Sequence, residues 1–133
     1  MSTATRYRAA VERRDLDAVG DLLAPEVVFH SPVTFHPFIG HDTVARLLAE
    51  VIQVFEDFRF TDELAIDDAH ALIFRAGVAG TDREIEGVDL LRFDTEELIA
   101  DFTVMLRPLS ALVPFAQAMG ERAQAAGLQT TRA

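Results

Sequence analysis

The sequence predicts an α+β domain in which helices come first, a long antiparallel sheet follows and a last helix ends the chain. Two periodicities carry this prediction. Up to about residue 55, apolar side chains recur every three to four residues, as in amphipathic helices. From Arg59 onward they alternate every second residue, as in half-buried strands. The chain has 133 residues, half of them hydrophobic, which suits one core, so we expect a single domain over residues 1–133.

Three helices and one short strand are expected before the sheet. The first helix ends near Arg14, and Asp15 is a suitable N-cap for a second, short helix that Pro25 closes. The segment EVVFHS, residues 26–31, is typical of a strand. A third amphipathic helix begins near His41, whose side chain is expected to cap it.

Four extended segments then follow, separated by short polar connections. Connections this short indicate an antiparallel meander. A strongly twisted sheet that helices cover on one face curls into a half-open cone, and the space between sheet and helices is a natural pocket. Pro108 begins the C-terminal helix. The expected strands are residues 59–67, 70–80, 84–93 and 97–106.

The composition excludes several kinds of function. The net charge is −10 and the twelve basic residues are all scattered arginines, so a nucleic acid or an anionic membrane would be repelled. Without Cys or Lys there is no thiol nucleophile, disulfide or Schiff-base lysine. No glycine-rich phosphate loop is present, and we expect no cofactor. The remaining groups suit proton transfer or water activation.

The hydropathy pattern predicts a soluble, cytoplasmic protein. No apolar run approaches the ~20 residues of a membrane span. The N-terminal segment MSTATRYRAA lacks the apolar stretch of a secretory signal.

Two segments carry a resemblance to a known family. YRAAVERRDLDAVGDLLAPEVVFHSPV resembles the opening of the nuclear transport factor 2-like superfamily, in particular its SnoaL-like and ketosteroid-isomerase-like members, and EGVDLLRFDTEELIADFTVMLRP resembles its closing hairpin. The resemblance extends from about Arg6 to Met119. It implies the cone-shaped fold but leaves the activity open, because the superfamily holds isomerases, cyclases, epoxide hydrolases, dehydratases and non-catalytic binding domains.

The resemblance also implies a site. Tyr7 matches the family tyrosine that helps to hold a developing enolate, and Asp89 matches the acid that is kept neutral by an apolar site, as known for ketosteroid isomerase. The family's general base is an Asp before a Pro at the end of the first strand, where this chain has Ser31 before Pro32. A serine hydroxyl is too weak a base without a partner that takes its proton, so the standard steroid isomerase mechanism is not expected.

Other groups could replace the missing base. His36, in the loop that follows, could swing over the pocket mouth with a suitable pKa, or could simply be solvated. Ser31 itself and a bound water are the other two options. A metal site formed by His30, His36 and His41 lacks any recognisable ligand spacing, and we expect no metal.

Strand alternation predicts what surrounds Asp89. It shares its face with Gly87 and Leu91, so desolvation would raise the pKa of its carboxyl. The alternative is a structural ion pair with Arg75 or Arg92. The predicted cavity wall comprises Phe29, Phe38, Leu91, Phe93, Phe102 and Val104.

Three functions are compatible with these features. The first is an enzyme of isomerase, cyclase or hydratase type that acts on an apolar carbonyl compound. The second is a binding module that holds a small apolar molecule without changing it, and the third is a structural domain whose interior is filled by Phe side chains. Apolar residues on the outer side of the sheet favour a homodimer through that face. They are Val88, Leu90, Thr103 and Met105.

Overall fold

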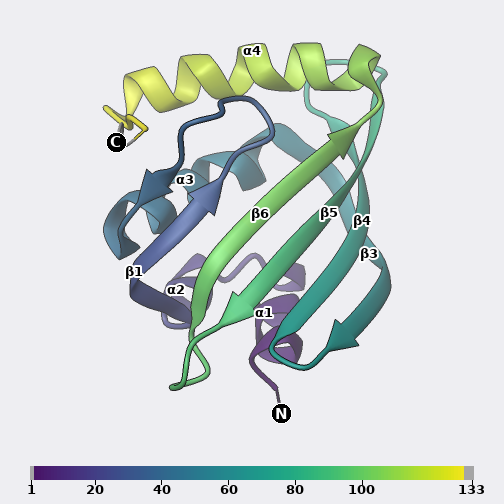
Figure 1. Ribbon diagram of the computed structural model, residues 1–133. Coiled ribbons are helices and arrows are strands. Elements are labelled where there is room, and N and C mark those ends of the chain that lie inside the picture. Colours follow the sequence, from purple (N-terminus) through teal and green to yellow (C-terminus); the bar gives the residue numbers. More distant parts are fainter. Residues whose placement is uncertain (1, 131–133) are drawn as a thin grey trace.

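The computed structural model describes residues 2–130 and places all helices against a curved six-stranded sheet (Figure 1). Helices α1 to α3 lie behind the sheet in this view, and α4 crosses its upper end. No helix within residues 2–130 combines the length and the apolar character that crossing a membrane requires. The elements are α1 (Thr3–Glu12), α2 (Leu16–Gly20), β1 (Leu23–His30), β2 (Phe38–Ile39), α3 (His41–Val54), β3 (Phe55–Ile66), β4 (Ala69–Val78), β5 (Glu84–Phe93), β6 (Ile99–Arg107) and α4 (Leu109–Ala125).

The strand order is β2-β1-β6-β5-β4-β3. Strands β3 to β6 form the predicted antiparallel meander, and β1 joins it by lying parallel to β6. The predicted α+β cone is confirmed. Strand β3 begins at Phe55, earlier than residue 59, because Phe55 already pairs with Val78 of β4. Its apolar side chain fits a helical period equally well, so the local pattern could not set this boundary.

Two predictions for the first third of the chain are wrong. Pro25 does not close a helix but lies inside β1, where the register with β6 shifts between Leu23 and Val28 and no ladder bond needs its missing N–H. His41 does not cap α3, because it is the first helical residue and Gly40 holds the N-cap position without a side-chain bond.

The imidazole of His41 instead connects two helices. Its Nε2 lies 2.8 Å from the Gly20 carbonyl oxygen at the end of α2, and its Nδ1 lies 3.0 Å from Asp42 Oδ1. Both neighbours are acceptors, so the imidazolium, which donates from both nitrogens, satisfies them best. These two hydrogen bonds raise the pKa of His41.

The inner face of the sheet carries the core. On β4, the buried side chains include Leu72, Phe74 and Val78. Gly87 of β5 pairs with Phe74 on one side and Leu106 on the other. A Cβ on Gly87 would lie 2.5 Å from Leu106 Cδ2 and 2.8 Å from Phe74 Cε2. The missing side chain therefore makes room for the Phe74 ring beneath the sheet.

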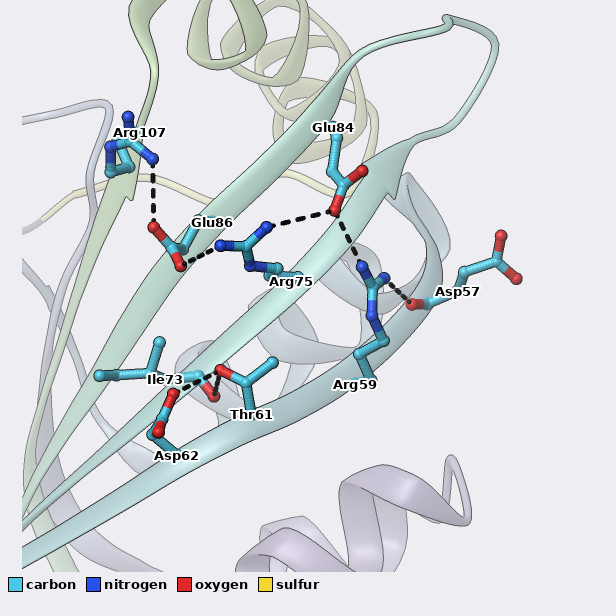
Figure 2. Close-up of polar contacts among 9 residues, drawn as sticks. All are labelled: Asp57, Arg59, Thr61, Asp62, Ile73, Arg75, Glu84, Glu86 and Arg107. Atoms are coloured by element: carbon cyan, nitrogen blue, oxygen red, sulfur yellow. Dashed lines mark hydrogen bonds and ion pairs between the residues drawn. The ribbon is translucent and has the colours of Figure 1, made fainter.

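The outer face carries a row of alternating charges across four strands (Figure 2). Arg59 Nη2 lies 2.8 Å from Glu84 Oε1, and Arg75 and Arg107 approach opposite oxygens of Glu86 at 3.3 and 3.1 Å. These groups are largely exposed, so each pair contributes at most about 1 kcal/mol. The row binds three arginines, Arg59, Arg75 and Arg107, to carboxylates of that same face.

Beside this row the outer face is less polar. Val88, Leu90 and Thr103 are half-buried, and Met105 is 55% exposed. The pairing of two such faces in a homodimer stays a prediction.

Replacing Gly87 with alanine should destabilise the protein. The new methyl group would displace Phe74 and Leu106, and overpacking of this kind costs about 1–3 kcal/mol in free energy of unfolding. Urea denaturation of Gly87→Ala measures the loss. Gly77→Ala is the matched control, because its Cβ would meet neighbours no closer than 3.7 Å. Equal stability of the two variants would contradict this account of the packing.

His41 should stabilise the fold in acid more than in base. Because its pKa is raised by folding, its contribution is fully present below the unfolded pKa of about 6.5 and is lost as pH rises through the folded pKa. The free energies of unfolding of the wild type and His41→Gln should therefore differ most near pH 5 and converge toward about pH 9. A gap that is constant across this range would refute the charged double hydrogen bond.

Candidate functional site

A cavity of about 130 Å³ lies between the inner face of the sheet and the helices. An apolar cavity of ~150 Å³ can hold a benzene-sized guest, so this space has the size for a small ring compound. Its walls come from helices α1 to α4, from strands β1 to β6 and from the loop after β1, and they are mostly apolar. Its polar lining side chains are those of Tyr7, Arg14, Ser31, Thr34 and Asp89.

Tyr7 and Asp89 meet at the buried end of this cavity. The Tyr7 hydroxyl donates a hydrogen bond to Asp89 Oδ2 at 2.8 Å, and both residues are 4% exposed. Tyr7 is held on the buried side of α1, and strand alternation turns Asp89 of β5 to the same interior. The alternative of an ion pair for Asp89 is wrong, because Arg75 and Arg92 are exposed on the opposite face of the sheet.

Burial dominates the electrostatics of this pair. Desolvation raises the pKa of Asp89 to about 7, and the hydrogen bond from Tyr7 opposes that rise. Desolvation and the negative charge of Asp89 both raise the pKa of Tyr7 well above its ordinary value. Near neutral pH, Asp89 can therefore gain or lose a proton while Tyr7 remains a hydroxyl donor.

Aromatic rings fix the phenol in place. The edge of the Tyr7 ring meets Phe102 at a centroid distance of 5.6 Å and Phe60 at 6.3 Å. Phe29 of β1 packs on Phe102 at 5.2 Å. Edge-to-face contacts of this kind hold a ring orientation. The hydroxyl is thereby kept pointing at Asp89.

Ser31 lies among the residues that line the cavity, at the end of β1. Its Oγ accepts a hydrogen bond from the backbone N–H of Val33 at 3.0 Å. Within residues 2–130, the structure gives this hydroxyl no imidazole or carboxylate partner that could take its proton. Ser31 is therefore positioned to contact a guest but not activated as a base.

The histidines lie outside the cavity lining. His36 is exposed, and its ring packs on Phe35 at 5.9 Å. Its predicted place over the cavity mouth is not found, because the loop directs Pro32 and Thr34 to the cavity and His36 to solvent. His30 points to the outer face, where its Nε2 lies 3.2 Å from Asp101 Oδ2.

The predicted cavity wall is partly observed. Phe29, Phe38, Phe102 and Val104 line the cavity, whereas Leu91 and Phe93 do not. Leu91 pairs with Phe102 and is fully buried, and Phe93 packs on His70 at 5.7 Å. Both residues lie further along β5 than Asp89, where the interior is filled.

Several lining residues were not anticipated. Arg14 is one, and its position in a turn gave no local signal of a cavity. Many others belong to α3 and α4, whose apolar stripes indicate burial without distinguishing a cavity wall from solid core. They include Leu47, Val51, Phe115 and Met119.

A curved α+β sheet that encloses a phenol–carboxyl pair in an apolar cavity defines a ketosteroid-isomerase-like, nuclear transport factor 2-like protein. The sequence model of the SnoaL-like domain family matches residues 4–102, and the chain belongs to this family. The resemblance noted from the sequence is thereby confirmed. No match was found among curated proteins.

Solved structures agree with this assignment. A steroid delta-isomerase from Pseudomonas aeruginosa is 36% identical with a TM-score of 0.87, over 96% of this chain and 93% of that chain. An uncharacterised protein with a cystatin-like fold from Silicibacter pomeroyi is 31% identical with a TM-score of 0.88, over 94% and 87% of the two chains. A ketosteroid-isomerase-like protein from Catenulispora acidiphila, in complex with trimethylamine, is 16% identical with a TM-score of 0.65, over 86% and 92%, and supports the fold alone.

Replacing Asp89 with asparagine should change how stability depends on pH. The folded state keeps the Asp89 proton up to about pH 7, whereas the unfolded chain releases it near pH 4. Wild-type stability therefore falls as pH rises from about 4 to about 7 and then levels off. Relative to wild type, Asp89→Asn should gain on the order of 4 kcal/mol across this window, since each of roughly three pH units is worth about 1.4 kcal/mol.

The measurement is urea denaturation of both proteins at several pH values. The amide oxygen of the introduced asparagine would still accept the Tyr7 hydrogen bond, so the comparison isolates the proton. In Tyr7→Phe the hydrogen bond that lowers the pKa of Asp89 is gone, so the decline should extend above pH 7. Parallel curves for wild type and Asp89→Asn would mean that Asp89 titrates normally.

Proposed function

We propose that the protein is a small-molecule enzyme of isomerase type, which moves a proton within an apolar carbonyl compound bound in the cavity. The observation that carries this proposal is the buried hydrogen bond of 2.8 Å between Tyr7 and Asp89 in an otherwise apolar space. In this pair the Tyr7 hydroxyl can polarise a carbonyl oxygen and stabilise the charge that develops on it. The steroid delta-isomerase of Pseudomonas aeruginosa, 36% identical, supports the same reaction class.

The cavity lining limits which group can accept the proton. Of the lining side chains in the described part of the chain, those that titrate are Tyr7, Arg14 and Asp89. Arginine stays protonated, and the pKa of Tyr7 is raised well above its ordinary value. Asp89, with a pKa of about 7, suits general base catalysis near neutral pH. We therefore assign proton transfer to Asp89, because Ser31 stands at the position of the family's general base and is not activated to act as one.

The reaction can then be written with every proton accounted for. The Asp89 carboxylate takes a proton from the carbon beside the carbonyl, and the C–H electron pair passes to the carbonyl oxygen to give an enolate. Protonated Asp89 is a poorer acceptor, so the Tyr7 hydroxyl can turn its hydrogen bond to the enolate oxygen. In a β,γ-unsaturated substrate the enolate is conjugated with the neighbouring double bond, so Asp89 can return the proton to the γ-carbon, and the double bond then lies between the α- and β-carbons. Starting compound and product are isomers, and no cofactor takes part in these steps.

The pH dependence of turnover should identify the role of Asp89. With a β,γ-unsaturated cyclic ketone, kcat/KM should rise with pH through about 7, because the ionised carboxylate is the active form. Formation of the conjugated ketone is followed by ultraviolet absorbance, and exchange of the α-hydrogen in D2O is followed by NMR. A rate that falls as pH rises through 7 would instead mean that Asp89 acts in its protonated form, as a hydrogen-bond donor.

Variants separate the two residues of the pair. Asp89→Asn should abolish both exchange and isomerisation. Tyr7→Phe should lower kcat by about a hundredfold, the usual effect of losing one oxyanion donor, and should shift the rising limb to higher pH. Asp101→Asn, on the outer face, is the matched control and should retain wild-type rates. Full activity of Asp89→Asn would overturn the assignment.

A non-catalytic binding module is the second candidate. The serine at the position of the family base favours it, because among the described residues Ser31 has no partner that would activate it. Under this function, the apolar ketone binds with the same affinity to wild type and Asp89→Asn, and its α-hydrogens never exchange. Catalytic exchange by the wild-type protein excludes it.

A further inference from the structure

Arg14 occupies an unusual backbone position at the rim of the cavity. Helix α1 ends in a turn in which the Asp15 N–H donates to the Ala10 carbonyl and the Arg14 N–H donates to the Val11 carbonyl, both at 2.9 Å. These two hydrogen bonds together define a Schellman motif, in which the residue with the left-handed backbone conformation is usually glycine. Here that residue is Arg14, with φ +57°. A residue other than glycine is unfavourable in this backbone conformation, yet the turn has a long cationic side chain at this position.

The Arg14 side chain reaches the cavity, and its hydrogen bonding to the rest of the protein is weak. Arg14 is among the lining residues, and its Nη2 donates one long hydrogen bond of 3.4 Å to the Ile52 carbonyl near the end of α3. Its neighbour Arg13 pairs with Asp15, but across residues 2–130 Arg14 forms no ion pair with a carboxylate. Most of its five N–H donors are therefore free for a guest.

The charges around the cavity single out Arg14 further. It is the one basic group among the lining residues of the described chain, and Asp89 is the one acidic group there. Asp89 is buried, whereas Arg14 is exposed, so the two polar ends of the cavity differ in depth. In a chain with a net charge of −10, a cation at a cavity rim creates a local site that favours an anion.

We infer that Arg14 selects guests with an anionic group, so that the cavity takes an apolar carbonyl compound whose far end carries a carboxylate or a similar anion. This inference rests on the proposed function for the carbonyl end of the guest. The carbonyl points to Tyr7 and Asp89, the apolar body lies against the phenylalanines, and the anion stays at the rim beside the guanidinium. Arginine binds a carboxylate through two parallel N–H donors, which fixes the orientation of the guest as well as its charge.

The test compares two guests of the same shape and different charge, phenylacetate and phenylacetamide, whose single ring matches the size of the cavity. Dissociation constants are measured by calorimetry at about pH 6, where the acid is ionised and Asp89 is mostly protonated. For wild type we expect the anion to bind about tenfold more tightly than the amide at low salt, with the preference shrinking as salt rises.

Three variants make the comparison specific. Arg14→Gln and Arg14→Gly should bind the amide as wild type does and lose the preference for the anion. Arg14→Gly also suits the left-handed turn, so that variant keeps a folded test available even if glutamine disturbs it. Arg13→Gln removes the adjacent charge outside the cavity lining and should keep the preference.

Each outcome decides a separate point. Equal binding of both guests by wild type, or an anion preference that survives in Arg14→Gly, would overturn the role of Arg14 while the cavity and its reaction stand. Binding of neither guest would overturn this inference, while the exchange assay with the cyclic ketone decides the proposed function separately. Loss of the preference for the anion in Arg13→Gln would mean that this preference comes from general surface charge and not from Arg14.

Discussion

The hydrogen bond between Tyr7 and Asp89 is the constraint on which the remainder of the site depends. A carboxyl group that is buried away from water is stable only when it is protonated or accepts a hydrogen bond. Here the Tyr7 hydroxyl donates that hydrogen bond. The same burial that disfavours the charged carboxylate sets its pKa to about 7, the range in which a group can both take and return a proton. The apolar walls of the cavity are thus the cause of the raised pKa of this carboxyl group.

The packing of the sheet explains how the fold encloses this pair. Asp89 can face the interior because β5 lies in the middle of the sheet, with β4 and β6 covering its edges. Two residues earlier, Gly87 leaves space for the ring of Phe74, and two residues later Leu91 closes the core. The cavity therefore has a filled end and an open rim. Arg14 and Ser31 are polar residues that line the cavity on the side away from this filled end.

Much of the fold was predictable because its signals are local. The change from a period of 3.6 to a period of two located the meander, and the short polar turns determined that it is antiparallel. The same alternation placed Asp89 and Phe102 inside. Boundaries were less predictable. Pro25 and Phe55 adopt strand conformation because of pairing with distant segments, and a local pattern carries no information on that pairing.

By itself the sequence determined the fold class, the family and the inward direction of Tyr7 and Asp89, since periodicity and residue type act within a few residues. Tertiary structure decided which of those inward residues surround empty space. Leu91 and Phe102 have the same pattern, yet one is packed core and the other a cavity wall. It also decided that His36 turns to solvent and that Arg14 turns to the rim. These outcomes depend on the curvature of the sheet and on where helices far apart in the chain come to rest against it.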